Sequence, residues 1–338
     1  MTSQQLPDGL SDDARWLAQA IDPAAGLIRF VEMHAAAYRD AAFLDDRLLQ
    51  NPMETRLCSL DAAMAAAATV KRDDAAWIFH IGHVGSTLIS RLLGELGGIL
   101  AIREPRSLRD LGAADGATRP ELAKGLRRLM SRVFGPDQRA LVKATSFVSE
   151  WARWLMAPNA RALFLYATPR NYIASILAGE NSVKELAALH EFRAQRLRDR
   201  GISLNGFDLN DAHRAAAAWA CEMTSLESAA ENRTDALILW ADFDAMLADM
   251  AMELARCAGH FGLAAPGETF TKLVEGPLMR RYSKALEFDY SPALRAELLA
   301  EAEREHCADI DAAIGALHQA ASAAPHLARA LDRAEREC

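Results

Sequence analysis

The stretch that decides the fold is WIFHIGHVGSTL, residues 77–88. Its first part, Trp77 to Ile81, is a short and nearly continuous apolar run, which is typical of a strand buried on both faces. Two glycines then permit a sharp turn. Apolar residues recur at helical spacing from Ser86 to Leu96, and the pair Gly97-Gly98 ends that helix. The stretch predicts a buried strand, a glycine turn and a helix in succession.

The same alternation of strand and helix continues along the chain. Further short apolar runs predict strands at 99–102, 139–142, 162–166 and 236–240, with helical patterns between them. Such alternation indicates a parallel sheet that helices cover on both faces. We therefore expect an α/β fold of the P-loop type, with three layers and a central parallel sheet.

Helices are expected to dominate the remainder. Ser11 followed by two aspartates suits a helix N-terminus, and Asp22-Pro23 suits a helix end. These signals predict helices at about 11–21, 24–39 and 57–68, in a helical N-terminal segment packed on the core. The expected organisation is this segment over 1–72, an α/β domain over 73–290 with a helical insertion at about 184–231, and a C-terminal helical segment over 291–338.

Composition excludes several classes of protein. Apolar residues make up 51% and charged residues 25%, so the chain can form an ordinary globular core. A net charge of -8 argues against dedicated nucleic-acid binding. The five cysteines are scattered, which indicates reduced thiols in a reducing compartment. The N-terminus has no apolar signal region, and no apolar run reaches the ~20 residues of a membrane span. We expect a cytoplasmic protein.

Residues Gly82 to Thr87 form a candidate anion site. Glycines let the backbone approach a ligand closely, and the amides of the loop and of the following helix start carry partial positive charge. Ser86 and Thr87 can donate hydroxyl hydrogen bonds to the same oxygens. The ATPase motif GxxxxGK[ST] is absent, because the loop is shorter and lacks the lysine. We expect a phosphate or sulfonate of a nucleotide here. The alternative is a simple turn with Ser86 as N-cap.

At this loop the chain resembles the PAPS-dependent sulfotransferases, where PAPS is 3′-phosphoadenosine 5′-phosphosulfate. The family's loop reads approximately Pro-Lys/Arg-Ser-Gly-Thr-Thr between a strand and a helix. Gly82, His83, Val84, Gly85, Ser86 and Thr87 lie over it position for position. The resemblance covers roughly residues 77–284. It implies PAPS as co-substrate, PAP as product and no metal. It also places His83 where the family's basic residue contacts the phosphosulfate bridge and the leaving oxygen.

Two further candidates follow the next strands, where residues just past the carboxyl ends line the ligand crevice. The resemblance implies a general base here or nearby, and Glu104 is the candidate that would take the proton from the acceptor. The alternative is that Glu104 pairs with Arg103 or Arg106 and does no chemistry. Lys143 matches the family's lysine and is expected to neutralise the phosphosulfate, the alternative being an ordinary surface lysine. Thr145, where cytosolic branches carry their base, is a poor base.

The family's second signature is Arg-x-Pro-x5-Ser, whose arginine and serine bind the 3′-phosphate. Pro169 and Ser175 fit its spacing, but Ala167 stands at the arginine position. Arg170 is expected to reach the same phosphate from a different backbone point, together with Ser175. The alternative is a solvated Arg170 and a packed Ser175.

Late in the chain, the resemblance implies a basic segment that closes over the nucleotide, and Arg280, Arg281 and Lys284 are its candidates. A solvated basic turn is the alternative. We interpret Asp242 and Asp244 as structural, one as a helix N-cap and one in a loop hydrogen bond, and expect no metal site.

The leading hypothesis is therefore a sulfotransferase that transfers a sulfuryl group from PAPS to a hydroxyl or amine. The acceptor, a small molecule, glycan or lipid, is not readable from the sequence. A catalytically weak or inactive PAP- or nucleotide-binding relative is the alternative, because His83 and Ala167 replace the family's cations. A P-loop kinase is a third hypothesis, which the missing lysine disfavours.

Overall fold

The computed structural model describes residues 5–50, 52–208, 210–280 and 291–336. Its centre is a five-stranded sheet with the order β5-β6-β4-β7-β8, and each neighbouring pair is parallel. These strands are β4 (Ala76–His80), β5 (Ile99–Arg103), β6 (Arg139–Lys143), β7 (Arg161–Tyr166) and β8 (Leu237–Asp242). The expected α/β fold with a central parallel sheet is confirmed.

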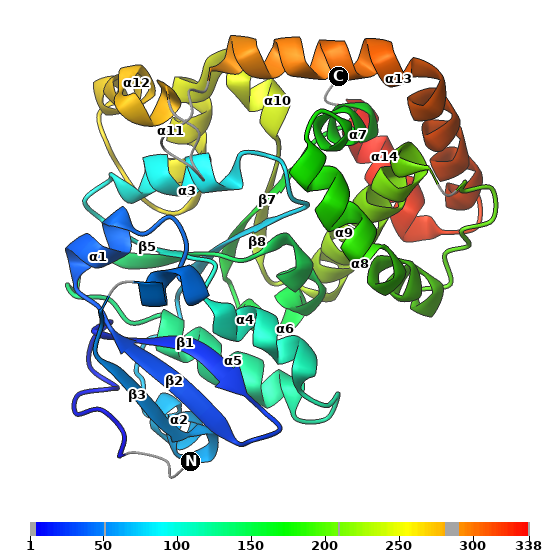
Figure 1. The fold of residues 1–338 in the computed structure, drawn as a ribbon. Coiled ribbons are helices and arrows are strands. Elements are labelled where there is room, and N and C mark those ends of the chain that lie inside the picture. The colour runs from blue at the N-terminus through cyan, green and yellow to red at the C-terminus, as the bar shows by residue number, and fades with distance from the viewer. Residues whose placement is uncertain (1–4, 51, 209, 281–290, 337–338) are drawn as a thin grey trace.

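Helices cover both faces of this sheet (Figure 1). On one face α3 (Ser86–Gly94) packs against β4, β5 and β6, and α11 (Met250–His260) lies beside it. On the other face α9 (Asp211–Asn232) and the 3-10 helix η3 (Ser146–Trp151) pack against β4. Every residue of β4 is buried, as its apolar sequence predicts for a central strand.

The remaining helices extend these layers. Before β7 they are α1 (Ala35–Asp40), η1 (Asp46–Gln50), α2 (Leu60–Ala67), α4 (Arg106–Asp110), η2 (Leu111–Ala113), α5 (Arg119–Met130) and α6 (Ala152–Leu155). After β7 they are α7 (Pro169–Leu177), α8 (Glu180–Asp199), α10 (Phe243–Met246), η4 (Leu247–Asp249), α12 (Gly267–Glu275), η5 (Pro277–Arg280), α13 (Pro292–Ala321) and α14 (Pro325–Arg336). The helices α8 and α9 lie where the helical insertion is expected, and α13 and α14 lie in the range expected for the C-terminal segment. Within the described ranges, no helix is long and apolar enough to cross a membrane.

The strand order fixes where a ligand crevice would lie. The chain leaves β4 for β5 and β6 on one side, and then crosses to β7 and β8 on the other. In open parallel sheets, ligands bind beyond the carboxyl ends of the strands at such a reversal. The loop at 82–87, Glu104 and Lys143 all follow or end strands at this edge.

The prediction of a helical N-terminal segment is wrong. Residues 16–59 contain a three-stranded antiparallel sheet of β1 (Trp16–Asp22), β2 (Leu27–Glu32) and β3 (Thr55–Ser59). Of the three expected helices, the last is correct over α2, and the second is retained only in α1. Figure 1 shows this sheet as a separate blue layer beside α4 and α5.

The error has a physical cause. The alanines of β1 favour a helix by intrinsic propensity, but six of its seven residues are buried, and packing against α4 and α5 outweighs propensity. Asp22-Pro23, which we interpreted as a helix end, begins a hairpin turn instead. The Asp22 carboxylate accepts a hydrogen bond from the Ala25 amide at 3.0 Å, and Gly26 adopts a positive φ of 66°.

Candidate functional site

The loop between β4 and α3 has the backbone of an anion cradle. Gly82, His83 and Gly85 have φ angles of 87°, 56° and 58°, in the left-handed region that favours glycine. Val84, between them, is fully buried and holds the loop to the core. Gly85 is the N-cap of α3 and has no side-chain capping bond, so the interpretation of Ser86 as the cap is wrong. The first amides of α3 therefore face this loop without a side-chain acceptor at the cap.

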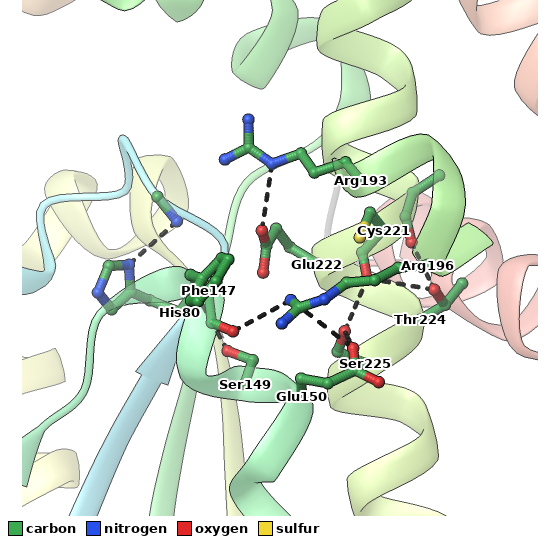
Figure 2. A network of polar contacts seen from close by, with 12 residues as sticks. His80, Phe147, Ser149, Glu150, Arg193, Arg196, Cys221, Glu222, Thr224 and Ser225 are labelled. Atoms are coloured by element: carbon green, nitrogen blue, oxygen red, sulfur yellow. Dashed lines mark hydrogen bonds and ion pairs between the residues drawn. The ribbon is translucent and has the colours of Figure 1, made fainter. Parts of the chain in front are cut away.

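His80 anchors the loop, and sequence reasoning missed it. The Gly82 amide donates to His80 Nδ1 at 3.0 Å, and His80 Nε2 lies 2.9 Å from the Ala144 carbonyl oxygen. These partners assign the tautomer in which Nε2 carries the proton. Ser149 of η3 donates to the His80 carbonyl at 3.4 Å (Figure 2). The signal in the sequence is a lone polar residue at the end of an apolar strand.

The loop is pressed against α10. A Cβ atom built on Gly85 would lie closer than 3.0 Å to three ring atoms of Phe243, a separation that real Cβ atoms essentially never show. Phe243 itself is 1% exposed, so its ring cannot move aside easily. The glycine at position 85 is therefore required by both the backbone angle and the close approach.

Thr87 offers a hydrogen-bond donor in the first turn of α3. The residue is 3% exposed, and its hydroxyl oxygen has no hydrogen-bond partner in the part of the chain that the structure describes. Buried hydroxyl groups are normally paired, because an unmade hydrogen bond there costs about 1–3 kcal/mol. An oxyanion seated on the loop would supply the acceptor.

Glu104 and Lys143 form an ion pair at the carboxyl ends of β5 and β6. The Lys143 side chain is fully buried, and that of Glu104 is 13% exposed. Thr145 Oγ1 lies 3.4 Å from the second carboxylate oxygen of Glu104. Glu104 also has a positive φ of 51°. Such strain on a non-glycine residue costs about 1–3 kcal/mol and clusters at functional sites.

The alternative partners expected for Glu104 are bound elsewhere. Arg103 donates to backbone carbonyls near α1, including that of Tyr38. Arg106 pairs with Asp46 and Asp110. The alternative that Lys143 is an ordinary surface lysine is also wrong, since its side chain has no exposed area. The structure therefore brings together the two residues that the sequence placed at neighbouring strand ends.

The 3′-phosphate candidates have other partners in this structure. Arg170 pairs with Glu303 at 3.1 Å and with Asp311 at 2.6 Å, both on α13. The Ser175 hydroxyl donates to the Tyr172 carbonyl at 2.8 Å. Binding of a phosphate by Arg170 and Ser175 stays a prediction. It requires Arg170 to break its ion pairs with the two acidic residues of α13.

Position 167, where the sulfotransferase signature has its arginine, is fully buried. Ala167 is fully buried, and its carbonyl oxygen accepts a hydrogen bond from the Trp219 indole at 2.9 Å. Trp219 of α9 is itself fully buried. A long cation at position 167 would have to fit into a fully buried place.

The late basic segment is only partly described. Arg280 is exposed at the end of η5, which packs against α3. Arg281 and Lys284 lie outside the described residues. Their closing over a nucleotide stays a prediction.

The two aspartates after β8 have the structural roles that we expected. Asp242 is the N-cap of α10 and accepts from two backbone amides, at 2.8 and 3.0 Å. Asp244 accepts from the Asn171 side chain at 3.0 Å and pairs with Arg295 of α13 at 2.7 Å. Over the described ranges, no group of three or more His, Cys, Asp or Glu residues is arranged to hold a metal ion.

Two sulfotransferases are among the solved structures that are similar to this chain. No family model matches the chain, and no curated protein matches it. A sulfotransferase domain from the curacin biosynthetic pathway is similar with a TM-score of 0.39 and 12% identity, over 68% of this chain and 89% of that one. The mouse sulfotransferase SULT7A1 complexed with PAP is similar with a TM-score of 0.34 and 11% identity, over 70% of this chain and 79% of that one. Because both TM-scores are below 0.5, we base the function on the residues of the site.

Proposed function

We propose that this chain is a sulfotransferase that moves a sulfuryl group from PAPS to a hydroxyl or amine and releases PAP. The observation that carries the proposal is the position of the Lys143–Glu104 pair at the strand ends beside a glycine loop that begins a helix. The unpartnered, buried hydroxyl of Thr87 supports an oxyanion as the ligand of that loop. Nucleotide phosphates are the common ligands of such helix starts.

The proposed reaction uses each of these groups once. Glu104 takes the proton from the attacking hydroxyl or amine. The new bond to sulfur forms as the bond from sulfur to the bridging phosphate oxygen breaks, and PAP leaves with that electron pair. Lys143, His83 and the loop amides stabilise the negative charge that develops on the leaving oxygen. The strained backbone at His83 and Glu104 supports this assignment, because it holds both side chains at the same edge of the sheet.

A nucleotide-binding relative that does not catalyse transfer is the second candidate. The ion pairs of Arg170 with α13 and the buried Ala167 favour it, since neither of these two described positions offers a free cation to the 3′-phosphate. Its loop would still bind a phosphate, but the Lys143–Glu104 pair would serve stability alone.

The Glu104→Gln substitution separates these two candidates. Glutamine keeps the shape of the side chain and an acceptor for Lys143, but it cannot take a proton. We expect binding of PAP to change less than about threefold and turnover to fall by about 10²–10⁴, the usual contribution of a general base. Calorimetric titration with PAP and release of PAP from PAPS measure the two effects. Glu121→Gln, on the exposed side of α5 with 79% of its side chain accessible, is the control. Undiminished turnover in Glu104→Gln would remove Glu104 from the mechanism.

A further inference from the structure

A cavity lies among the helices that follow β6, and none of the residues of the loop at 82–87 lines it. It has a volume of about 360 Å³ and lies between η3, α6, α8 and α9. Its polar walls include Glu150, Trp151, Arg153, Trp154, Arg196 and Arg200. Such a volume is at the lower end of the range for small-molecule sites.

The charge of this cavity is positive. Three arginines line it, at positions 153, 196 and 200, against the carboxylates of Glu150 and Asp199. The Glu150 carboxylate already has partners, because one of its oxygens pairs with Arg200 and accepts a hydrogen bond from the Ser225 hydroxyl at 3.2 Å. Asp199 is exposed and accepts from the Gln195 side chain at 2.7 Å. The lining therefore carries one more cation than carboxylates.

Figure 2 shows the polar contacts next to the cavity. The carboxylates in this network do not balance the positive charge of the lining. The buried carboxylate of Glu222 lies 3.4 Å from Arg193, which is not part of the lining. Burial raises the pKa of the Glu222 carboxyl above its usual range. Arg196 reaches Glu150 only at 3.8 Å and donates to the Phe147 carbonyl at 3.1 Å. Arg196 thus shares the carboxylate of Glu150 with Arg200.

Two donors of the lining residues lack acceptors. Arg196 is 7% exposed and Trp151 is 9% exposed. Over the described ranges, Arg196 Nη2 and Trp151 Nε1 have no hydrogen-bond partner. The Arg196 guanidinium lies over the rings of Phe147 and Phe192, 4.4 and 4.3 Å from their centroids. Stacking of this kind uses the faces of the guanidinium and leaves its in-plane N–H groups in need of an acceptor.

Both unsatisfied groups can only donate, so the missing partner is an acceptor. Positive charge and two orphaned donors select an oxyanion over a neutral or cationic ligand. Arg153, exposed and without an ion pair in the described chain, adds a further cation at the mouth of the cavity. A bare ion would leave most of about 360 Å³ empty, because one water occupies only about 30 Å³.

We propose that this cavity binds a small organic oxyanion, with a carboxylate, sulfate or phosphate group on a compact apolar body. The charged group would lie toward Arg196, Arg153 and the Trp151 indole, and the apolar body against Trp154 and Ala229. Both orphaned nitrogens are withdrawn from the surface, so binding would draw the Arg196 guanidinium toward the cavity. The proposal does not depend on the sulfotransferase assignment.

Calorimetric titration of the full chain tests this site. The probes are benzoate, phenyl sulfate and phenyl phosphate, with phenol as the neutral analogue and inorganic sulfate as the bare ion. We expect at least one aryl oxyanion to bind more tightly than inorganic sulfate, and phenol not to bind. Trp151→Phe removes the indole N–H and keeps an aromatic ring, and Arg153→Ala removes an exposed cation. Each should weaken that probe about tenfold, the usual loss for a hydrogen bond to a charged group.

Two control variants locate the binding. Arg198→Ala removes an arginine of the same helix that pairs with Glu191 outside the cavity, and should leave affinity unchanged. Thr87→Val alters only the first turn of α3, outside the cavity, and should also leave affinity unchanged. The proposal is overturned if no aryl oxyanion binds at millimolar concentration, or if phenol binds equally well. It is also overturned if Thr87→Val, and not the two cavity variants, reduces the affinity.

Discussion

The Gly85→Ala variant should lose about 2–5 kcal/mol of its free energy of unfolding. A positive φ costs an alanine about 1–2 kcal/mol, and overpacking a rigid site adds about 1–3 kcal/mol. Both effects apply at this position, where φ is 58° and the new methyl group would overlap the Phe243 ring. Urea unfolding followed by tryptophan fluorescence measures the loss.

Two other glycines separate the contributions. Gly26 has a φ of 66° but no atom within 4 Å of a built Cβ, so Gly26→Ala should show the backbone cost alone. Gly97 has an open environment and no positive φ, and Gly97→Ala should change stability by less than about 0.5 kcal/mol. If Gly85→Ala costs no more than Gly26→Ala, the loop is not held against Phe243.

Removal of the buried Lys143 cation should lower the free energy of unfolding by a similar amount. Lys143→Met keeps the length of the side chain but leaves the Glu104 carboxylate without its charge partner, in a place where only 13% of that side chain is exposed. Breaking a buried ion pair from one side costs about 3–5 kcal/mol. Urea unfolding measures it, and the double variant Glu104→Gln/Lys143→Met should recover at least half of the loss because no charge is left unpaired.

A surface pair provides the matched control for this cycle. Lys272 and Glu268 lie 3.5 Å apart with 72% of each side chain exposed. Lys272→Met should change stability by less than about 1 kcal/mol. An equally small effect of Lys143→Met, or no recovery in the double variant, would show that the Lys143–Glu104 pair is not a coupled buried pair.

The parallel sheet could be predicted from sequence because its strands are short and apolar, and all but the edge strand β8 are almost entirely buried. The pairing of Glu104 with Lys143 could also be predicted. Each residue lies at the end of a strand, and parallel strands bring such ends together. The antiparallel strand β1 could not be predicted, since its alanines carry a helical propensity that only the packing of α4 and α5 overrides.

Partners distant in the sequence were also beyond prediction. Arg170 forms ion pairs with Glu303 and Asp311 on α13. No local sequence pattern predicts a contact between residues that are so far apart in the sequence. His80 was missed because its role depends on two backbone groups, the Gly82 amide and the Ala144 carbonyl, and not on a neighbouring side chain. Both cases involve tertiary contacts, and the periodicity of a sequence predicts secondary structure but not such contacts.

The central claim is that the loop at 82–87 binds the nucleotide of PAPS, and calorimetric titration of the full chain with PAP and with ATP tests it most directly. We predict that PAP binds and ATP binds at least tenfold more weakly. The Thr87→Val substitution should weaken PAP, because it removes the hydroxyl that has no other acceptor in the described chain. Binding of ATP with no binding of PAP would contradict the sulfotransferase assignment.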